Sequence, residues 1–212
     1  PLEAVWAEAV THKDLFKNDR NPGLTTTRGV VEQLTGLPVD NTVILDQAAL
    51  HDLVDAVGGV VVPVAVDLPI GGRLGADGPP AQVSDVVEWL RPGGRRLDGV
   101  QATWFARSRA TTDADRLQRQ RCLALDLVAR ATPGVLARAY PRLATVLEGA
   151  VTTDVAAADL PAWAELVGRV RSGRTRSLAL PSTSDGAQAQ AAVRAALTAP
   201  ADQGTTTVTA GC

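Results

Sequence analysis

The sequence has no Met, only two Cys, and few aromatic residues, which make up 3% of its 212 residues. Two cysteines are too few for a disulfide scaffold, although Cys122 and Cys212 could form one bridge or each pair with another segment. No apolar run reaches the roughly 18 residues that span a membrane. The net charge of −2 excludes a protein that coats nucleic acid by bulk positive charge.

What remains is an ordinary globular composition, with 45% hydrophobic and 21% charged residues. Lysine is scarce as well, because 19 of the 21 basic residues are Arg and only Lys13 and Lys17 are Lys. The length fits one large domain, or one domain with a tail. Since the chain lacks Met and opens with Pro1, we expect a processed or truncated piece.

The pattern between 41 and 66 is typical of a layered α/β fold. An apolar strand at 41–45 leads to Asp46, which caps a helix at 47–57. A valine run at 60–66 then predicts a strand buried on both faces. Further helices are expected at 2–10, 25–34 (ending at Gly36), 112–131, 135–147, 160–170 and 187–197, strands at 102–107 and 175–180, and a loop at 67–80.

The composition changes after residue 181, where Ser, Thr, Ala, Gln and Asp dominate. We therefore expect a domain at 1–181 and a polar, flexible tail at 182–212.

The chemically densest region is an arginine cluster at 107–121. Arg107 and Arg109 are two residues apart at the end of the expected strand, so they should share one face. Arg116 and Arg119 are three apart on the following helix, with Gln120 beside them. Guanidinium groups bind phosphate oxygens bidentately, and a helix N-terminus adds positive charge. The cluster predicts a phosphate or pyrophosphate site.

The helix phase places these arginines on or beside an apolar stripe. Leu123 and Leu127 fall within about 60° of Arg116 at 100° per residue. This stripe favours a phosphate that carries an apolar group. Two alternatives remain open: the arginines could pair with surface acids, and Asp113 and Asp115 could act as bases, orient the arginines or cap the helix.

At these residues the sequence resembles the LytR-CpsA-Psr family of cell-wall glycopolymer ligases, in its actinobacterial form. The resemblance covers about residues 1–181. Each motif is modest alone, but their order and spacing are specific. The motifs are Thr35–Asp40, Leu53–Val64, Arg91–Ala102, Phe105–Arg109 and Asp115–Gln120.

The resemblance implies a three-layer α/β/α sandwich with a mixed sheet and an apolar cavity for a polyprenyl chain. It implies a phosphotransferase that moves a glycopolymer from a polyprenyl-pyrophosphate carrier to peptidoglycan. Such enzymes are anchored to the cell membrane by an N-terminal helix and act on its extracytoplasmic face. The implied catalytic residues are Arg107, Arg109, Arg116 and Arg119, with Gln120, Asp115, Asp113, Leu123 and Leu127 binding substrate.

One departure from the family pattern concerns metal binding. Family members open with strands that carry an acidic pair linked to Mg²⁺ and a Pro-Arg-Asp motif, and neither is present in this sequence. We therefore expect the first strands, the Mg²⁺ ligands and one arginine to be missing, and the piece to be inactive by itself.

The same residues are also compatible with a function other than that of a ligase. The alternative is a non-catalytic module that binds polyprenyl (pyro)phosphate or an anionic wall polymer. Nucleic-acid binding is not expected, because aromatic residues are sparse and the charges balance. His12 and His51 are isolated and suggest no zinc site. The glycan, the acceptor, the oligomeric state and the redox state of the cysteines are not predicted.

Overall fold

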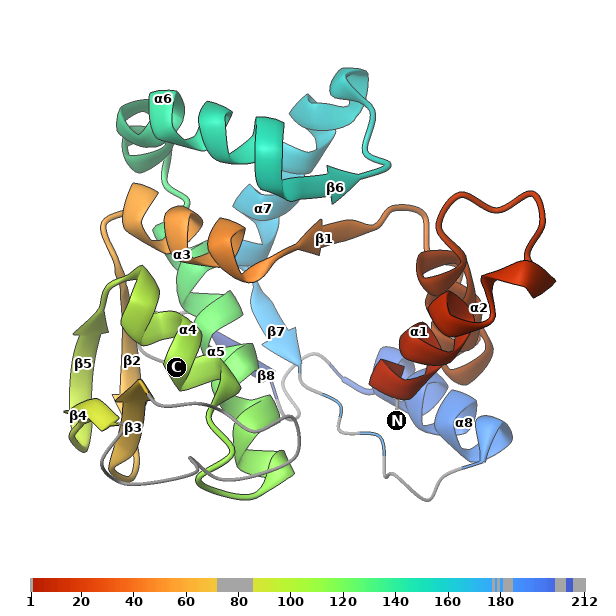
Figure 1. Cartoon of the computed structure of the whole chain (residues 1–212), viewed down its shortest axis with the longest axis horizontal. Coiled ribbons are helices and arrows are strands. Elements are labelled where there is room, and N and C mark those ends of the chain that lie inside the picture. The colour runs from red at the N-terminus through yellow and green to blue at the C-terminus, as the bar shows by residue number, and fades with distance from the viewer. Residues whose placement is uncertain are drawn as a thin grey trace. The chain divides into compact units, whose positions relative to one another are not determined.

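The computed structural model describes residues 2–71, 86–176, 178, 180, 185–200 and 205–207. The chain forms two compact units. Unit 1 combines Pro1–Thr42 with Arg176–Thr206, and unit 2 comprises Val43–Thr175 with Thr207–Cys212. Figure 1 shows the elements of both units in chain order.

Unit 1 is helical in its described part, with α1 (Leu2–Thr11), the 3₁₀ turn η1 (Lys13–Leu15), α2 (Pro22–Thr35) and α8 (Gly186–Thr198). The side chain of Asn21 caps α2 by accepting the Leu24 N–H. Gly36 ends this helix in the left-handed region at φ 70°, which glycine adopts without strain. The helices predicted at 2–10 and 25–34 are therefore confirmed, as is the stop at Gly36.

The helix α8 packs on α2. Ala189 and Val193 are buried, and the amide of Gln190 donates to the carbonyl of Gln33 at 2.7 Å. The helix predicted at 187–197 is confirmed. The division into a domain at 1–181 and a tail stays a prediction, although part of that tail forms this packed helix.

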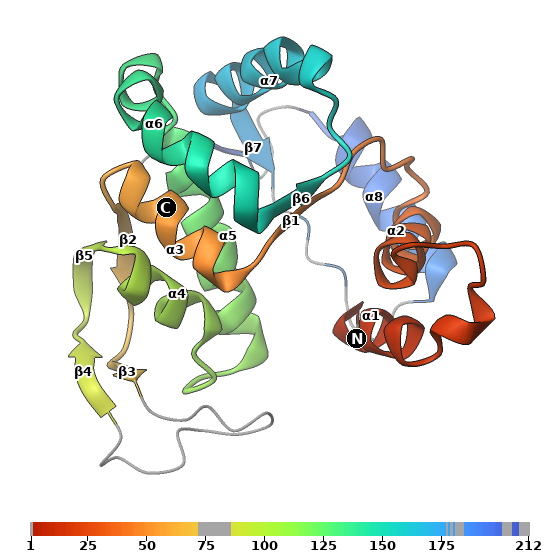
Figure 2. The same cartoon turned by 45° about the horizontal axis from the view of Figure 1, so that its top comes forward.

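Unit 2 combines short strands with longer helices (Figures 1 and 2). The α/β class predicted from the sequence is confirmed. The elements are β1 (Val43–Leu45), α3 (Gln47–Ala56), β2 (Val60–Val64), β3 (Leu68–Gly71), β4 (Val86–Leu90), β5 (Gly93–Leu97), α4 (Gly99–Arg107), α5 (Asp113–Arg130), α6 (Pro133–Ala150), β6 (Val151–Thr153), η3 (Ala157–Asp159), α7 (Leu160–Ser172) and β7 (Arg174–Arg176), and the short strand β8 (Thr205–Thr207) follows α8.

The strand pairs of unit 2 are antiparallel: β1 with β6, β2 with β5, and β3 with β4. In β2 the side chains of Val60, Val62 and Val64 are buried, whereas Pro63 is exposed. The expectation of burial on both faces was therefore wrong. The alternation of this strand is that of an antiparallel strand with one face on the core.

The core of unit 2 lies where β2, β3 and the two helices α4 and α5 meet. Its largest fully buried side chains include Phe105, Leu68 and Leu97. Asp126 of α5 is fully buried among them and accepts hydrogen bonds from the Val61 N–H and from Arg130. This core fixes the positions of α4 and α5, which carry the arginine cluster.

The strand predicted at 102–107 was wrong, because these residues belong to the helix α4. Asp98 caps this helix, and its carboxylate accepts the Gln101 N–H at 2.8 Å. Ala102, Phe105 and Ala106 are buried at helical spacing. The capping box of Asp98 and Gln101 starts a helix that continues through this segment.

The loop predicted at 67–80 was wrong in its first part, because Leu68–Gly71 forms β3, and residues 72–80 lie outside the described residues. The predicted helices at 112–131, 135–147 and 160–170 are confirmed as α5, α6 and α7. Pro141 lies inside α6, as expected. The strand predicted at 175–180 corresponds to β7 at Arg174–Arg176.

Cys122 of α5 is buried and disulfide-bonded, so it is not a free thiol.

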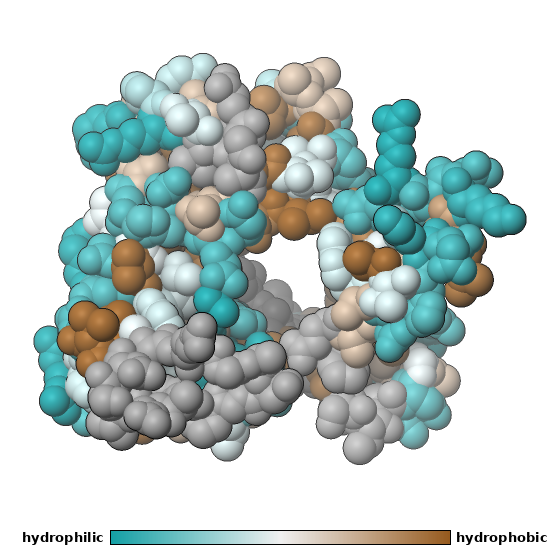
Figure 3. Space-filling view, in the orientation of Figure 1, coloured by the Kyte–Doolittle hydropathy of each residue, from teal (hydrophilic) through white to brown (hydrophobic). Residues whose placement is uncertain are grey.

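Exposed hydrophobic residues lie in small groups among hydrophilic ones on the face shown in Figure 3. Within the described residues, every helix is too short or too polar to cross a bilayer.

Candidate functional site

The first turn of α5 is built on a capping box between Thr112 and Asp115. The Thr112 hydroxyl accepts the Asp115 N–H at 3.2 Å, and the Asp115 carboxylate accepts the Thr112 N–H at 3.2 Å. The same carboxylate accepts the Thr112 hydroxyl at 2.8 Å. These bonds from Thr112 lower the pKa of Asp115 below its ordinary 3.8. Of the roles left open for Asp115, helix capping is the one this geometry supports.

The sequence suggested that Arg107 and Arg109 lie at the end of a strand, and this prediction was wrong. Arg107 is the last residue of α4, and Arg109 lies in the turn between α4 and α5. Both side chains are exposed, and Arg107 donates to the side chain of Gln47 at 2.6 Å. Between them, Ser108 ends α4 and is only 2% exposed. A buried residue therefore anchors the turn, with one exposed arginine on either side.

Two arginines converge on Asp113. Its carboxylate oxygen lies 3.1 Å from Nη2 of Arg116 and 3.7 Å from Nη1 of Arg109. The Nε of Arg116 donates to the same oxygen at 3.2 Å. The side chain of Asp113 is 70% exposed, whereas that of Arg116 is 16% exposed. An exposed carboxylate thus lies between two guanidinium groups, as an oxygen of a bound phosphate would.

Arg119 differs from the other arginines because it is only 8% exposed. Its guanidinium donates to the carbonyls of Phe105, at 2.8 Å, and Ser108, and to the Thr111 hydroxyl at 2.7 Å. Its Cζ lies 6.0 Å from the centre of the Phe105 ring. Burial lowers the pKa of Arg119, with repulsion from Arg116 adding to it and attraction to Asp115 opposing it. The group still remains charged at neutral pH.

The remaining predicted site residues lie further along α5. The side-chain amide of Gln120 donates to the Ala106 carbonyl at 3.2 Å. Leu123 is buried in the core, and Leu127 packs against it. The apolar stripe predicted beside the arginines is therefore present, and these two leucines contribute it to the core.

A cavity of about 370 Å³ adjoins the cluster, between α4, α5 and the β2–β3 connection. Of the predicted site residues, Arg119 and Asp115 are among those that line it, and its walls are mostly apolar. Sequence reasoning missed Thr111 and Gln118, whose spacing carries no recognisable motif. It also missed the β2–β3 connection, because Ala65 and Val66 were predicted to belong to the buried strand at 60–66. The other described lining residues are Pro63, Ala65, Val66, Leu68, Phe105 and Cys122.

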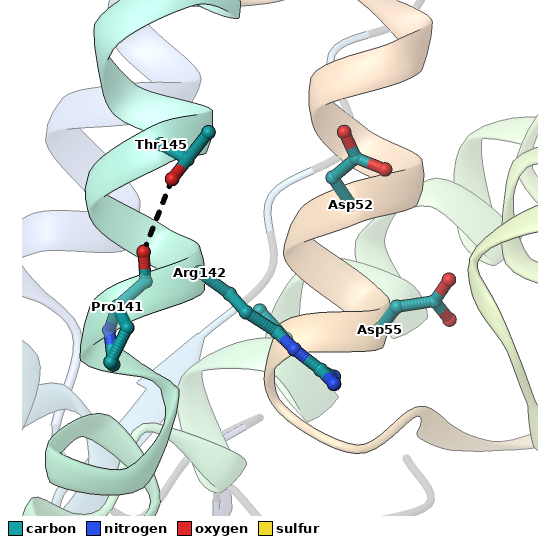
Figure 4. Close-up of a pocket in the computed structure, with 6 residues that line it drawn as sticks. Asp52, Asp55, Pro141, Arg142 and Thr145 are labelled. Carbon is teal, nitrogen blue, oxygen red and sulfur yellow. Dashed lines mark hydrogen bonds between the residues drawn. The ribbon is translucent and has the colours of Figure 1, made fainter.

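A second hollow, of about 470 Å³, lies between α3 and α6 (Figure 4). Arg142 reaches from α6 toward the C-terminal end of α3, whereas Asp55 extends from α3 on the side away from α6. Asp55 already accepts the Gly99 N–H at 2.8 Å and lies 3.1 Å from Nε2 of His51. Because its charged groups do not converge, this hollow is a weaker candidate site.

The acidic and other metal-binding side chains of the described residues do not gather into a metal site. Among the described residues, no three His, Cys, Asp or Glu side chains are grouped so that they could hold a metal ion. The described part of the chain thus offers no ligand set for the Mg²⁺ that the resemblance implies.

The described part of unit 2 is an α/β fold in which an arginine cluster adjoins a largely apolar cavity. The LytR_cpsA_psr family model matches residues 9–206, and the chain belongs to this family. No curated protein matches the sequence.

Solved structures share the fold at low sequence identity. Bacillus subtilis TagV is 20% identical, with a TM-score of 0.54, over 84% of this chain and 69% of TagV. TagT, solved with LIIa-WTA bound, is 19% identical, with a TM-score of 0.57, over 81% of this chain and 66% of TagT.

A third similar structure is that of a Streptococcus agalactiae protein, which is 22% identical, with a TM-score of 0.55, over 69% of this chain. The chain spans 48% of the length of that protein.

Proposed function

We propose that this chain carries a phosphotransferase site that attaches a glycopolymer from a polyprenyl-pyrophosphate carrier to peptidoglycan. Membership of the LytR-CpsA-Psr family supports a general role in cell-wall glycopolymer transfer. One observation carries the finer proposal: Arg109 and Arg116 converge on one carboxylate oxygen of Asp113, and Asp115 and Arg119 of the same cluster line a largely apolar cavity. A polyprenyl pyrophosphate has the matching parts, an anionic head and an apolar chain.

In the proposed reaction, a peptidoglycan hydroxyl attacks the phosphorus that carries the glycan. The bond from this phosphorus to the bridging oxygen breaks, polyprenyl phosphate leaves, and the hydroxyl proton passes to solvent. The product is a phosphodiester. Phosphoryl transfer depends mainly on stabilising charge on the phosphate oxygens, which guanidinium groups accomplish. We propose Arg107, Arg109 and Arg116 as the catalytic residues that contact the phosphate. The other predicted site residues are Arg119, Gln120, Asp115, Asp113, Leu123 and Leu127.

The partners, the location and the metal ion of this reaction are also proposals. We propose a lipid-linked glycan and peptidoglycan as partners, and the extracytoplasmic face of the cell membrane as the location, with anchorage through an N-terminal helix. Mg²⁺ is proposed only by resemblance to the family, and its ligands would have to lie outside the described residues.

The test is glycan transfer from a synthetic polyprenyl-pyrophosphate donor to peptidoglycan, measured with the full-length protein. We expect Arg109→Ala to lower kcat/KM by about 100-fold, the loss typical of one preorganised donor. Arg194→Ala removes an exposed arginine of unit 1 and is the matched control. Transfer that Arg109→Ala leaves unchanged would refute the assignment.

The second candidate function is a non-catalytic module that binds the same lipid. The engagement of Arg119 with protein carbonyls favours it, because those donors are not available to a transition state. Binding of polyprenyl pyrophosphate with no turnover on added peptidoglycan would support this function over the transferase.

A further inference from the structure

The C-terminal end of α4 requires hydrogen-bond donors that the helix itself does not contain. The last four carbonyls of an α-helix have no partner within it. In α4 the Ser108 N–H satisfies only the carbonyl of Trp104, at 2.9 Å. Phe105 and Ala106 are both buried, so leaving their carbonyls without a partner would cost free energy.

Two consecutive residues of α5 supply these donors. Arg119 donates to the carbonyls of Phe105 and Ser108, and Gln120 donates to that of Ala106 at 3.2 Å. Arg119 also donates to the hydroxyl of Thr111, at the far end of the same turn. One buried guanidinium fork thus binds the turn at 105, 108 and 111, and its positive charge lies at the negative end of the α4 dipole.

The turn that these bonds hold carries Arg107 and Arg109. Both are exposed, and Ser108 between them is buried. If the bonds from α5 were lost, the backbone of Ser108 would be freed and the two arginines would lose their fixed spacing. The side chains of Arg119 and Gln120 are themselves held in place, by the main-chain oxygens of α4 and Ser108 and, for Arg119, by the Thr111 hydroxyl.

We infer that Arg119 and Gln120 are positioning residues, which hold the α4–α5 turn so that Arg107 and Arg109 meet the anion. The part of this inference that concerns the anion rests on the proposed function. The part that concerns the turn rests only on the hydrogen bonds described above. Direct contact with the phosphate then falls to Arg107, Arg109 and Arg116.

A lysine exchange at two positions separates positioning from contact. Lysine keeps the charge but lacks the planar fork that reaches several acceptors at once. We therefore expect Arg119→Lys to speed amide hydrogen exchange at 105–111 by about fivefold or more, the effect of losing a buried hydrogen bond. Arg109→Lys should leave this exchange unchanged. Gln120→Ala is the milder second variant, and it should speed exchange at the end of α4 even if Arg119→Lys does not fold.

Binding of inorganic pyrophosphate, measured by titration calorimetry, provides the second readout. Arg119→Lys should weaken binding on its own. In an Arg109→Ala background it should add less than about twofold, because coupled residues do not act additively. Unchanged exchange at 105–111, or an effect fully additive with that of Arg109→Ala, would overturn the inference.

The two hypotheses fail in different ways. If the unsubstituted protein does not bind pyrophosphate, the proposed function is contradicted, and the exchange measurement alone decides whether Arg119 and Gln120 hold the turn. If pyrophosphate binds and exchange does not respond to either substitution, only the positioning role is refuted.

Discussion

The carboxylate of Asp126 accepts the main-chain N–H of Val61 at 2.8 Å, and this bond joins α5 to β2 inside the core. The same carboxylate accepts from Nε of Arg130 at 2.6 Å. Asp126 is fully buried, so each of these bonds forms away from water. The arginine-bearing helix is thus fixed to the sheet by a polar contact as well as by apolar packing.

We expect Asp126→Ala to destabilise the protein by about 3 kcal/mol, because it leaves a buried N–H and a partly buried arginine without their acceptor. Chemical denaturation measures this loss. Glu165→Gln is the matched control, since it weakens an exposed ion pair with Arg169 on α7. That control should cost less than about 1 kcal/mol. Equal effects of the two substitutions would contradict the role given to Asp126.

Removal of the α5 cap should also lower stability. Thr112→Ala deletes the hydroxyl of the capping box, and we expect a loss of about 1 kcal/mol. Thr112→Ser keeps the hydroxyl and should restore most of it. A Thr112→Ser variant as unstable as Thr112→Ala would show that the methyl group matters, and not the cap.

The same cap predicts a dependence on pH. The hydrogen bonds from Thr112 lower the pKa of Asp115 below 3.8, so the folded state favours the ionised carboxylate. This contribution is present above the ordinary pKa and is lost as the pH falls through the lowered one. In Thr112→Ala the stability should therefore fall less between neutral pH and about pH 3 than in the unsubstituted protein. A parallel loss in both proteins would refute this linkage.

Asp113 lies between Arg109 and Arg116 and should compete with an anionic ligand. Asp113→Asn removes the competing charge, and we expect inorganic pyrophosphate to bind about threefold more tightly, the modest effect of an exposed ion pair. Asp14→Asn, in unit 1, changes the net charge equally and is the control. Tighter binding in both variants would indicate only the change in net charge.

Gly99, the first residue of α4, cannot accept a side chain. A Cβ at this position would overlap the ring and the carbonyl of His51 on α3. We expect Gly99→Ala to cost more than about 2 kcal/mol, measured by thermal unfolding, because main-chain atoms must move. Gly168→Ala, in the open part of α7, has no such overlap and should stabilise the helix slightly. The prediction fails if the two substitutions behave alike.

The elements that the sequence predicted well share strong local signals. Asp46 before α3 and Gly36 after α2 both act as the sequence predicted. In contrast, residues 102–107 of α4 were predicted to form a strand. Its capping box could have identified it, since Gln101 stands three residues after Asp98.

The candidate site was predictable only in part. The spacing of Arg116, Arg119 and Gln120 placed them correctly on one helix. It did not show that Arg119 and Gln120 bind main-chain carbonyls, because those carbonyls belong to another helix and depend on how α4 and α5 pack. The cavity wall at Ala65 and Val66 depends equally on tertiary packing, which a local pattern does not contain.

Unit 1 is assembled from both ends of the chain, and α8 contacts α2 across more than 150 residues, from Gln33 to Gln190. Unit 2 draws nearly all its residues from the continuous segment between them. During synthesis, α2 therefore leaves the ribosome long before its partner helix is made. Loop closure over such a separation is slow and entropically costly. We therefore expect unit 2 to fold first, while α2 still lacks its partner helix. A chain released before α8 is complete would expose an apolar face of α2 to chaperones or proteases.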